Sequence, residues 1–190
     1  MKTLKKLSLL TFVMTLSLGA AHADCSLKGE PKVSWVAFKT MKKVGVGGSF
    51  DKATSEGNKS AKDIKALLAN QKISIDTGSV NTKNPARDKK IVKHFFGALK
   101  ESTKGMITGQ IKKVSKDTLT IDIFMNGKKQ TVPMKYSFEK GMVKADGHID
   151  VLDFALSDGL AQINKACYAL HEGKTWSHVE ISFEQKVTCK

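Results

Sequence analysis

The chain has 190 residues and a formal net charge of +14 at pH 7, a length that suits one domain with a sizeable core. Of its 32 basic residues, only Arg87 is an arginine. Because base-edge and bidentate phosphate recognition favours arginine, the composition argues against nucleic acid as a partner. We interpret the charge as a lysine-rich surface that is either solvated or attracted to anionic lipid head groups and envelope polymers.

The first 23 residues have the three-part pattern of a secretory signal peptide. Lysines near the start precede an apolar run over residues 7–18, and small residues occupy positions 21 and 23. This run is too short for a comfortable membrane span, which argues against a retained anchor. We therefore predict a signal peptide over residues 1–23, export to the periplasm and a mature domain over residues 24–190. Removal of the three signal lysines reduces the net charge from +14 to +11.

Much of the mature chain alternates apolar and polar residues with a period of two, which is typical of half-buried strands. In chain order, the predicted strands cover residues 32–39, 44–51, 72–80, 105–114, 117–125, 130–138, 141–151 and 178–187. Short turns such as Asn126-Gly127 separate consecutive strands and make them antiparallel neighbours. Eight such strands form either a sandwich or a closed barrel, and closure removes the exposed edges.

Three segments break this alternation and predict helices: residues 60–71 with Ser60 as N-cap, residues 84–99, and residues 158–173. In the second, Asn84 can cap the helix and Pro85 suits its first position. One face then carries Ile91, Val92, Phe95, Ala98 and Leu99, with Phe96 at its border, and the other carries Arg87, Lys89, Lys90, Lys93 and His94. Such a helix can lie on a membrane surface or close the mouth of a barrel, and periodicity does not decide between them.

Asp88 falls among the apolar positions of the helix predicted over residues 84–99. An acid in a first helical turn is stabilised by the helix dipole, and we adopt this interpretation. The alternative is that Asp88 ties the helix to strand ends or to the polar head of a ligand.

Three cysteines follow the signal, and an oxidising compartment favours one disulfide and one free thiol. Sequence alone permits three pairings. In a closed antiparallel barrel, however, the start of the first strand lies near the end of the last. This arrangement favours a Cys25–Cys189 disulfide and leaves Cys167 free.

Catalytic and metal-binding motifs find little support in the sequence. The mature histidines are His94, His148, His171 and His178, without a metal-ligand spacing such as HExxH. Cys167 and His171 are four residues apart, and a thiolate pair there is the best enzyme hypothesis. No third orienting residue is evident and two ligands do not make a zinc site, so we expect neither an enzyme nor a metal protein.

The block over residues 79–96 resembles the signature of the YceI-like family, in which a Ser-Ile-x-Thr strand end leads to Arg-Asp, an aliphatic residue and Phe-Phe. The matching residues are Ser79, Val80, Thr82, Arg87, Asp88, Ile91, Phe95 and Phe96. Val46, Gly48 and Phe50 match the second strand of the family, and Asp153 and Phe154 match a later Asp-Phe pair. The chain departs from the family in two places: it lacks a histidine late in the first strand, and its segment around Cys167 is longer.

The resemblance implies an all-β fold, an eight-stranded antiparallel lipocalin-like barrel with one to three short helices. It also implies an apolar tunnel for a long-chain lipid, either an isoprenoid quinone or polyprenyl compound or a fatty acid or amide, in a periplasmic and often dimeric protein. We therefore expect a bound lipid, no required cofactor, transient contact with a membrane surface and a homodimer. The expected ligand-binding residues are Trp35, Val46, Phe50, Ile75, Ile91, Phe95, Phe96, Ile121, Ile123, Met134, Tyr136, Phe138 and Phe154.

Three functions follow from these patterns. The first is carriage or storage of a lipid in the periplasm, with a role in envelope stress. The second is a secreted basic module that binds anionic envelope polymers and has a filled barrel core, because alternating apolar residues fill a core as readily as they line a tunnel. The third is a thiol enzyme that uses Cys167.

Overall fold

The computed structural model describes residues 25–100 and 105–190, so the predicted signal peptide lies outside the described residues. The strands are β1 (Cys25–Lys39), β2 (Val44–Phe50), β3 (Ala53–Glu56), β4 (Ser60–Ala61), β5 (Lys72–Asp76), β6 (Val80–Asn81), β7 (Met106–Val114), β8 (Thr118–Met125), β9 (Lys128–Glu139), β10 (Met142–Asp150) and β11 (Thr175–Cys189). The helical segments are α1 (Ile64–Leu68), η1 (Thr77–Ser79), α2 (Pro85–Lys90), η2 (Ile91–Phe95), η3 (Phe96–Ala98), η5 (Val151–Phe154), α3 (Ser157–Ala166) and α4 (Tyr168–His171).

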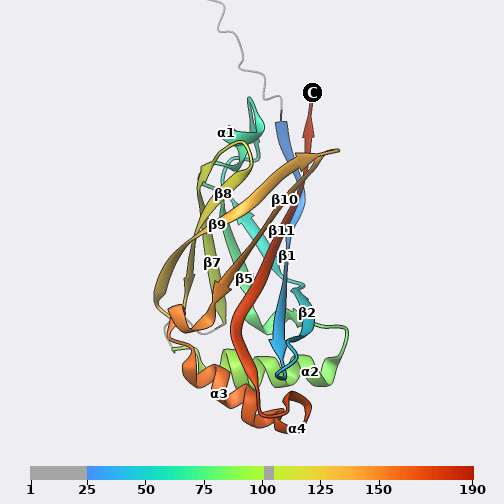
Figure 1. The fold of residues 1–190 in the computed structure, drawn as a ribbon. Helices are drawn as coiled ribbons and strands as arrows, with labels where there is room; N and C mark the ends of the chain where they lie inside the picture. Colours follow the sequence, from blue (N-terminus) through green and yellow to red (C-terminus); the bar gives the residue numbers. More distant parts are fainter. Residues whose placement is uncertain (1–24, 101–104) are drawn as a thin grey trace, which may run out of the picture.

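The strands form one antiparallel sheet in the order β3-β5-β7-β8-β9-β10-β11-β1-β2-β6, with β4 beside β1. This sheet curls into a half-barrel (Figure 1). The predicted lipocalin-like antiparallel fold is therefore confirmed. Each predicted strand is present because its period-two pattern gives it one apolar face to bury.

One of the eight predicted strands, over residues 72–80, is interrupted, and the short strands β3 and β4 were not predicted. The chain bends between β2 and β3, and the 3₁₀ turn η1 separates β5 from β6. Asp76 starts this turn because its carboxylate accepts a hydrogen bond from the amide of Gly78 at 2.8 Å. Backbone hydrogen bonds from Asp51 to Ser79 and from Asp76 to Lys52 join the β2–β3 bend to the segment around η1.

The long strands β1 and β11 pair along most of their length and bring Cys25 opposite Cys189. The two residues form a disulfide, with their Cα atoms 4.0 Å apart. The predicted pairing is thus confirmed, and Cys167 is a free, half-buried thiol. We call this half of the molecule, which also carries α1, the disulfide end.

Helices α2, α3 and α4 gather at the opposite end of the sheet, which we call the helix end (Figure 1). Asn84 caps α2 by accepting a hydrogen bond from the amide of Arg87 at 3.0 Å, and Pro85 occupies the first turn, as predicted. The helix continues through one π-helical turn, η2, and then tightens to a 3₁₀ turn, η3. Gly159 lets α3 pack closely here, because a Cβ atom at this position would lie 2.9 Å from the carbonyl oxygen of Phe95.

The other two predicted helices are present but differ from the prediction, one in its N-cap and the other in its continuity. The N-cap of α1 is Asp63, whose carboxylate accepts a hydrogen bond from the amide of Ala66 at 2.7 Å. The prediction of Ser60 as the cap was wrong because Ser60 pairs with β1 as part of β4. The segment predicted over residues 158–173 is helical but breaks at Cys167 into α3 and α4.

Candidate functional site

The sheet and the helix end enclose a cavity of about 520 Å³, a size within the range of small-molecule sites. Its strand walls follow the period-two alternation, as in Val33, Trp35 and Ala37 of β1 and in Val179, Ile181 and Phe183 of β11. Segments η2, η3 and α3 complete the wall at the helix end. The alternative of a completely filled core is contradicted by this cavity.

Most of the predicted ligand-binding residues lie in the cavity wall: Trp35, Val46, Phe50, Ile75, Ile91, Phe95, Phe96, Ile121, Ile123 and Met134. The aromatic members pack together at the helix end. The rings of Phe95 and Phe96 meet edge to face with centroids 5.1 Å apart, and the Phe96 ring lies 6.0 Å from that of Phe50. The structure thus brings these residues around one space, and their contact with a ligand stays a prediction.

Three predicted residues do not line the cavity. Tyr136 and Phe138 belong to the part of β9 that pairs with β10 at the disulfide end. Tyr136 is buried there without a hydrogen-bond partner for its hydroxyl in the described part of the chain, and burial raises its pKa. Phe154 is completely buried in η5, below the β8–β9 turn, where Asn126 donates a hydrogen bond to its carbonyl oxygen at 2.9 Å.

Sequence reasoning missed two groups of lining residues. The first is Val179, Ile181 and Phe183, whose alternation in β11 was visible in the sequence and would have identified them. The second is Leu160, Ile163 and Leu170 on α3 and α4. No sequence pattern revealed these residues as lining, because the way in which α3 packs under the sheet depends on the whole fold.

The helix predicted over residues 84–99 turns its apolar side toward the sheet. Ile91 and Phe95 line the cavity, and Phe96 and Leu99 are buried. Asp88 accepts hydrogen bonds from the amide and hydroxyl of Thr82 at 2.9 and 2.6 Å. It therefore lies in the first turn as predicted but also ties the helix to the end of β6, as the alternative interpretation proposed.

The cavity wall becomes polar at the helix end, where Lys39, Arg87, Lys90 and His171 join the lining. The Nδ1 atom of His171 lies 2.6 Å from the Thr175 hydroxyl, which in turn donates a hydrogen bond to Asn164. Desolvation, followed by the charges of Lys39 and Lys90, lowers the pKa of His171 below its ordinary value of 6.5. The imidazole is therefore neutral at pH 7.

Cys167 also lines the cavity, but it makes no hydrogen bond to His171 in the described part of the chain. The imidazole is instead directed to Thr175 through Nδ1. Within residues 25–100 and 105–190, no group of three or more His, Cys, Asp or Glu side chains could hold a metal ion. In the same ranges, no helix is both long enough and apolar enough to cross a membrane.

Solved structures of similar fold include proteins from three bacteria. A polyisoprenoid-binding domain from Saccharophagus degradans, implicated in plant cell wall breakdown, has a TM-score of 0.61 at 14% identity, covering 89% of this chain and 100% of that one. BcnA of Burkholderia cenocepacia has a TM-score of 0.57 at 20% identity, covering 83% and 96%. A YceI protein of Campylobacter jejuni has a TM-score of 0.53 at 17% identity, covering 98% and 99%. A search of curated protein sequences finds no significant match.

The curled antiparallel sheet and its internal apolar cavity define a lipocalin-like protein. The sequence profile of the YceI-like domain matches residues 27–187. The chain therefore belongs to the YceI-like family, as the Arg-Asp and Phe-Phe block predicted.

Proposed function

We propose that this protein binds one long-chain amphipathic lipid in its cavity and carries or stores it in the periplasm. The lipid is an isoprenoid quinone or polyprenyl compound, or a fatty acid or amide. The cavity of about 520 Å³, walled by apolar side chains from the strands and the helix end, is the observation that carries the proposal. Each methylene buried there contributes about 0.8 kcal/mol, so a chain of many carbons binds firmly without specific polar contacts.

Trp35 provides a second argument for a ligand. It lines the cavity, and its indole N–H is buried without a hydrogen-bond partner among the described residues. A buried donor without a partner costs about 1–3 kcal/mol. An acceptor atom on a bound molecule, within reach of this N–H, would remove that cost.

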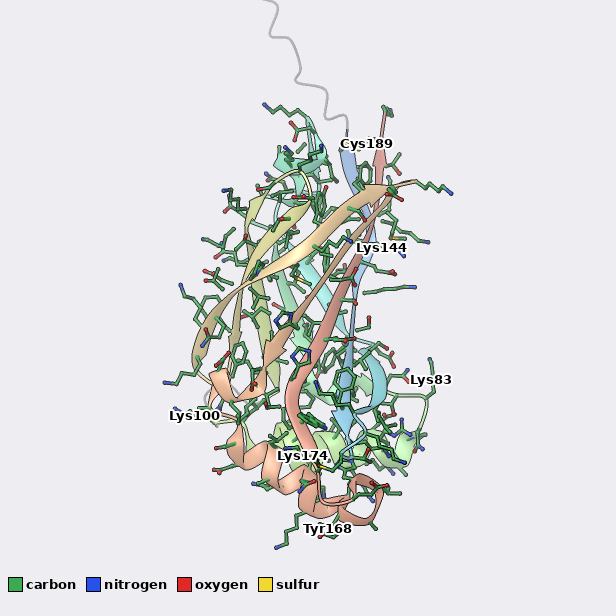
Figure 2. The ribbon with its side chains drawn as sticks, viewed as in Figure 1. Lys83, Lys100, Lys144, Tyr168, Lys174 and Cys189 are labelled. Carbon is green, nitrogen blue, oxygen red and sulfur yellow. A yellow bond between two sulfur atoms is a disulfide. The ribbon has the colours of Figure 1, made fainter. Side chains whose placement is uncertain are left out.

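The outer surface of the helix end suits transient contact with a membrane. Met41, Tyr168 and Leu170 are exposed there by 71%, 66% and 62%, and Figure 2 shows Tyr168 at the tip of this end, opposite Cys189. Lys43 and Lys174 hold their ammonium groups 4.8 and 4.6 Å from the centroid of the Trp176 ring. Exposed apolar side chains among lysines favour an anionic bilayer. Leu170 and Trp176 of this surface also belong to the cavity wall.

The predicted signal peptide and the Cys25–Cys189 disulfide support a periplasmic location, because disulfides persist in oxidising compartments. Fractionation of cells that express the full chain tests this location.

A homodimer also stays a prediction, which sedimentation velocity of the mature chain tests directly. A role in envelope stress is a further prediction, tested by survival of a deletion strain under envelope-damaging conditions.

The carrier function is tested by extracting the purified protein. Native mass spectrometry should show a complex heavier than the protein alone, and organic extraction should release a lipid. Since Cys167 lines the cavity, adding that lipid back should also slow alkylation of the Cys167 thiol by iodoacetamide. If the protein carries no lipid, takes up neither quinones nor fatty acids nor fatty amides, and shows no protection of Cys167, the proposal is wrong.

Two matched variants test whether the helix lies over the cavity. Phe95→Asp places a carboxylate in the apolar wall and should abolish lipid retention, because a buried charge is strongly unfavourable there. Lys89→Glu changes an exposed residue of α2 outside the lining and should leave retention unchanged. If Lys89→Glu impairs retention and Phe95→Asp does not, α2 and η2 act as a membrane-surface helix instead.

A further inference from the structure

The charged side chains in the cavity wall all have the same sign. Lys39 ends β1, Arg87 and Lys90 lie on α2, and no Asp or Glu of the described ranges is among the lining residues. All three positions belong to the helix end, where the end of β1 lies beside α2 (Figure 1), and Arg87 and Lys90 are exposed. The cavity therefore combines an apolar body with one basic rim.

Nothing within the described ranges neutralises this rim. The side chains of Lys39, Arg87 and Lys90 make no hydrogen bond or ion pair there. Asp88, the nearest acid along the chain to Arg87 and Lys90, directs one carboxylate oxygen to Thr82 and makes no ion pair within those ranges. Desolvation by burial lowers the pKa of the nearby His171, and the charges of Lys39 and Lys90 lower it further.

The hydrogen bonds around His171 determine which ring nitrogen is left for a ligand. The side-chain amide of Asn164 donates to the carbonyl oxygen of Gly173 at 3.1 Å, so its oxygen accepts from the Thr175 hydroxyl at 2.9 Å. Thr175 has then used its one proton, and its oxygen accepts from Nδ1 of His171 at 2.6 Å. In the neutral ring the Nε2 atom of His171 is then an acceptor, so His171 adds no hydrogen bond to an anion and the charged residues alone can bind one.

We propose that the ligand has an anionic head group, a carboxylate or a phosphate, which binds to Lys39, Arg87 and Lys90 at the rim while its hydrocarbon tail fills the cavity. This proposal rests on the proposed function, because it specifies which class of lipid the same cavity takes. Arg87 can hold either group through two parallel hydrogen bonds, and the lysines add point charges. A neutral quinone or fatty amide gains none of these charge-assisted contacts, so the rim selects among lipids of equal length.

Binding of hexadecanoic acid, hexadecyl phosphate and hexadecanamide to the delipidated protein at pH 8 tests the proposal, with inorganic phosphate as a fourth ligand. Because the tails are identical, the two anions and the amide differ only in the head group. We expect the anions to bind at least tenfold more tightly than the amide, since one charge-assisted hydrogen bond is worth on the order of a tenfold change in affinity. Equal affinity of all three lipids would overturn the anionic head group and leave the carrier function intact.

Two double variants assign the preference to the rim. Arg87→Gln with Lys90→Gln should lower the affinity for the anions at least tenfold more than the affinity for the amide, because Lys39 is then the one charge left in the rim among the described residues. Lys89→Gln with Lys93→Gln removes the same charge from neighbouring exposed positions that do not line the cavity, and should keep the preference. Loss of the preference in this second pair alone would overturn the proposed rim.

Two further outcomes are informative. One distinguishes a lipid head group from a free anion, and the other distinguishes failure of the anionic head group from failure of lipid binding itself. Inorganic phosphate that binds as tightly as hexadecyl phosphate would show a site for free anions and would overturn the lipid head group. If neither the amide nor the anions bind to the delipidated protein, the proposed function itself is wrong. Amide binding by the Arg87→Gln and Lys90→Gln double variant serves as the control that its cavity is folded.

Discussion

The two ends of the barrel are built from the same strands but are packed differently. At the disulfide end, Leu67 and Leu68 of α1 and Leu119 and Val143 of the sheet are at most 1% exposed. Toward the helix end, Trp35, Phe38 and Val179 are only half-buried and line a cavity. The strand β1 spans both regions, from Cys25 in the covalent link to Lys39 at the basic rim.

This difference in packing suggests that one end of the sheet stabilises the fold and that the other end serves the proposed binding. A closely packed core and a disulfide keep the strands in register at one end. Large apolar side chains that remain half-exposed around a hollow support the proposed binding site at the other end. The disulfide end can therefore stabilise the fold while the helix end leaves room for a ligand.

Loss of the disulfide should have the largest effect on stability. Cys25 and Cys189 are 164 residues apart in sequence, and the loop-closure estimate for so long a loop is about 5 kcal/mol. The double variant Cys25→Ser, Cys189→Ser should lower the free energy of unfolding by about that amount, measured by urea denaturation. Cys167→Ser is the matched control and should change stability little; an equal loss in both would show that the disulfide does not stabilise this end.

Two aliphatic truncations compare the filled and the hollow regions directly. Leu119→Ala empties a position that is 1% exposed at the disulfide end and should reduce the free energy of unfolding by about 2–5 kcal/mol. Ile181→Ala enlarges an existing cavity beside a half-buried residue and should cost about 1 kcal/mol or less.

Lipid affinity should respond in the opposite order, with a loss for Ile181→Ala and little change for Leu119→Ala. Urea denaturation and a lipid titration on both variants measure the two effects. Equal costs in stability, together with equal losses in affinity, would show that the two regions are not functionally distinct.

The sequence predicts those features of the fold and of the candidate site that are determined by short stretches of the chain or by the order of the strands. The strands, the Asn84 cap and the Cys25–Cys189 pairing follow from period-two patterns, a short-range hydrogen bond and antiparallel order, and all three are confirmed. Tyr136 and Phe138 alternate as regularly as Ile121 and Ile123, yet only the latter pair lines the cavity. Alternation shows which side of a strand faces inward, but not whether the space there is filled.

The basic rim was even less accessible to sequence reasoning. It combines Lys39 at the end of β1 with Arg87 and Lys90 of α2, which are far from Lys39 in the chain. The sequence placed Arg87 and Lys90 on the polar face of a helix, which was compatible with simple solvation. Only the packing of that helix beside β1 and α4 makes these charges part of one cavity wall.

The smallest effect is the contribution of His171 to the pH dependence of stability. It reflects the burial of this side chain and the positive charges around it. Its pKa is lowered in the folded protein by desolvation and by Lys39 and Lys90, so the unfolded chain binds the proton at a higher pH than the folded chain. The free energy of unfolding should therefore fall as the pH drops through 6.5 and level off below the folded pKa.

The variant His171→Asn keeps an N–H donor near the Nδ1 position for Thr175 but cannot titrate, so it should lack this part of the pH dependence. Urea denaturation of both proteins across this pH range measures the difference. A bound anionic lipid would offset the positive field and reduce the difference, whereas a neutral lipid would leave the charges of Lys39 and Lys90 uncompensated. A pH dependence that is identical in the variant would show that the helix end does not hold His171 in a positive field.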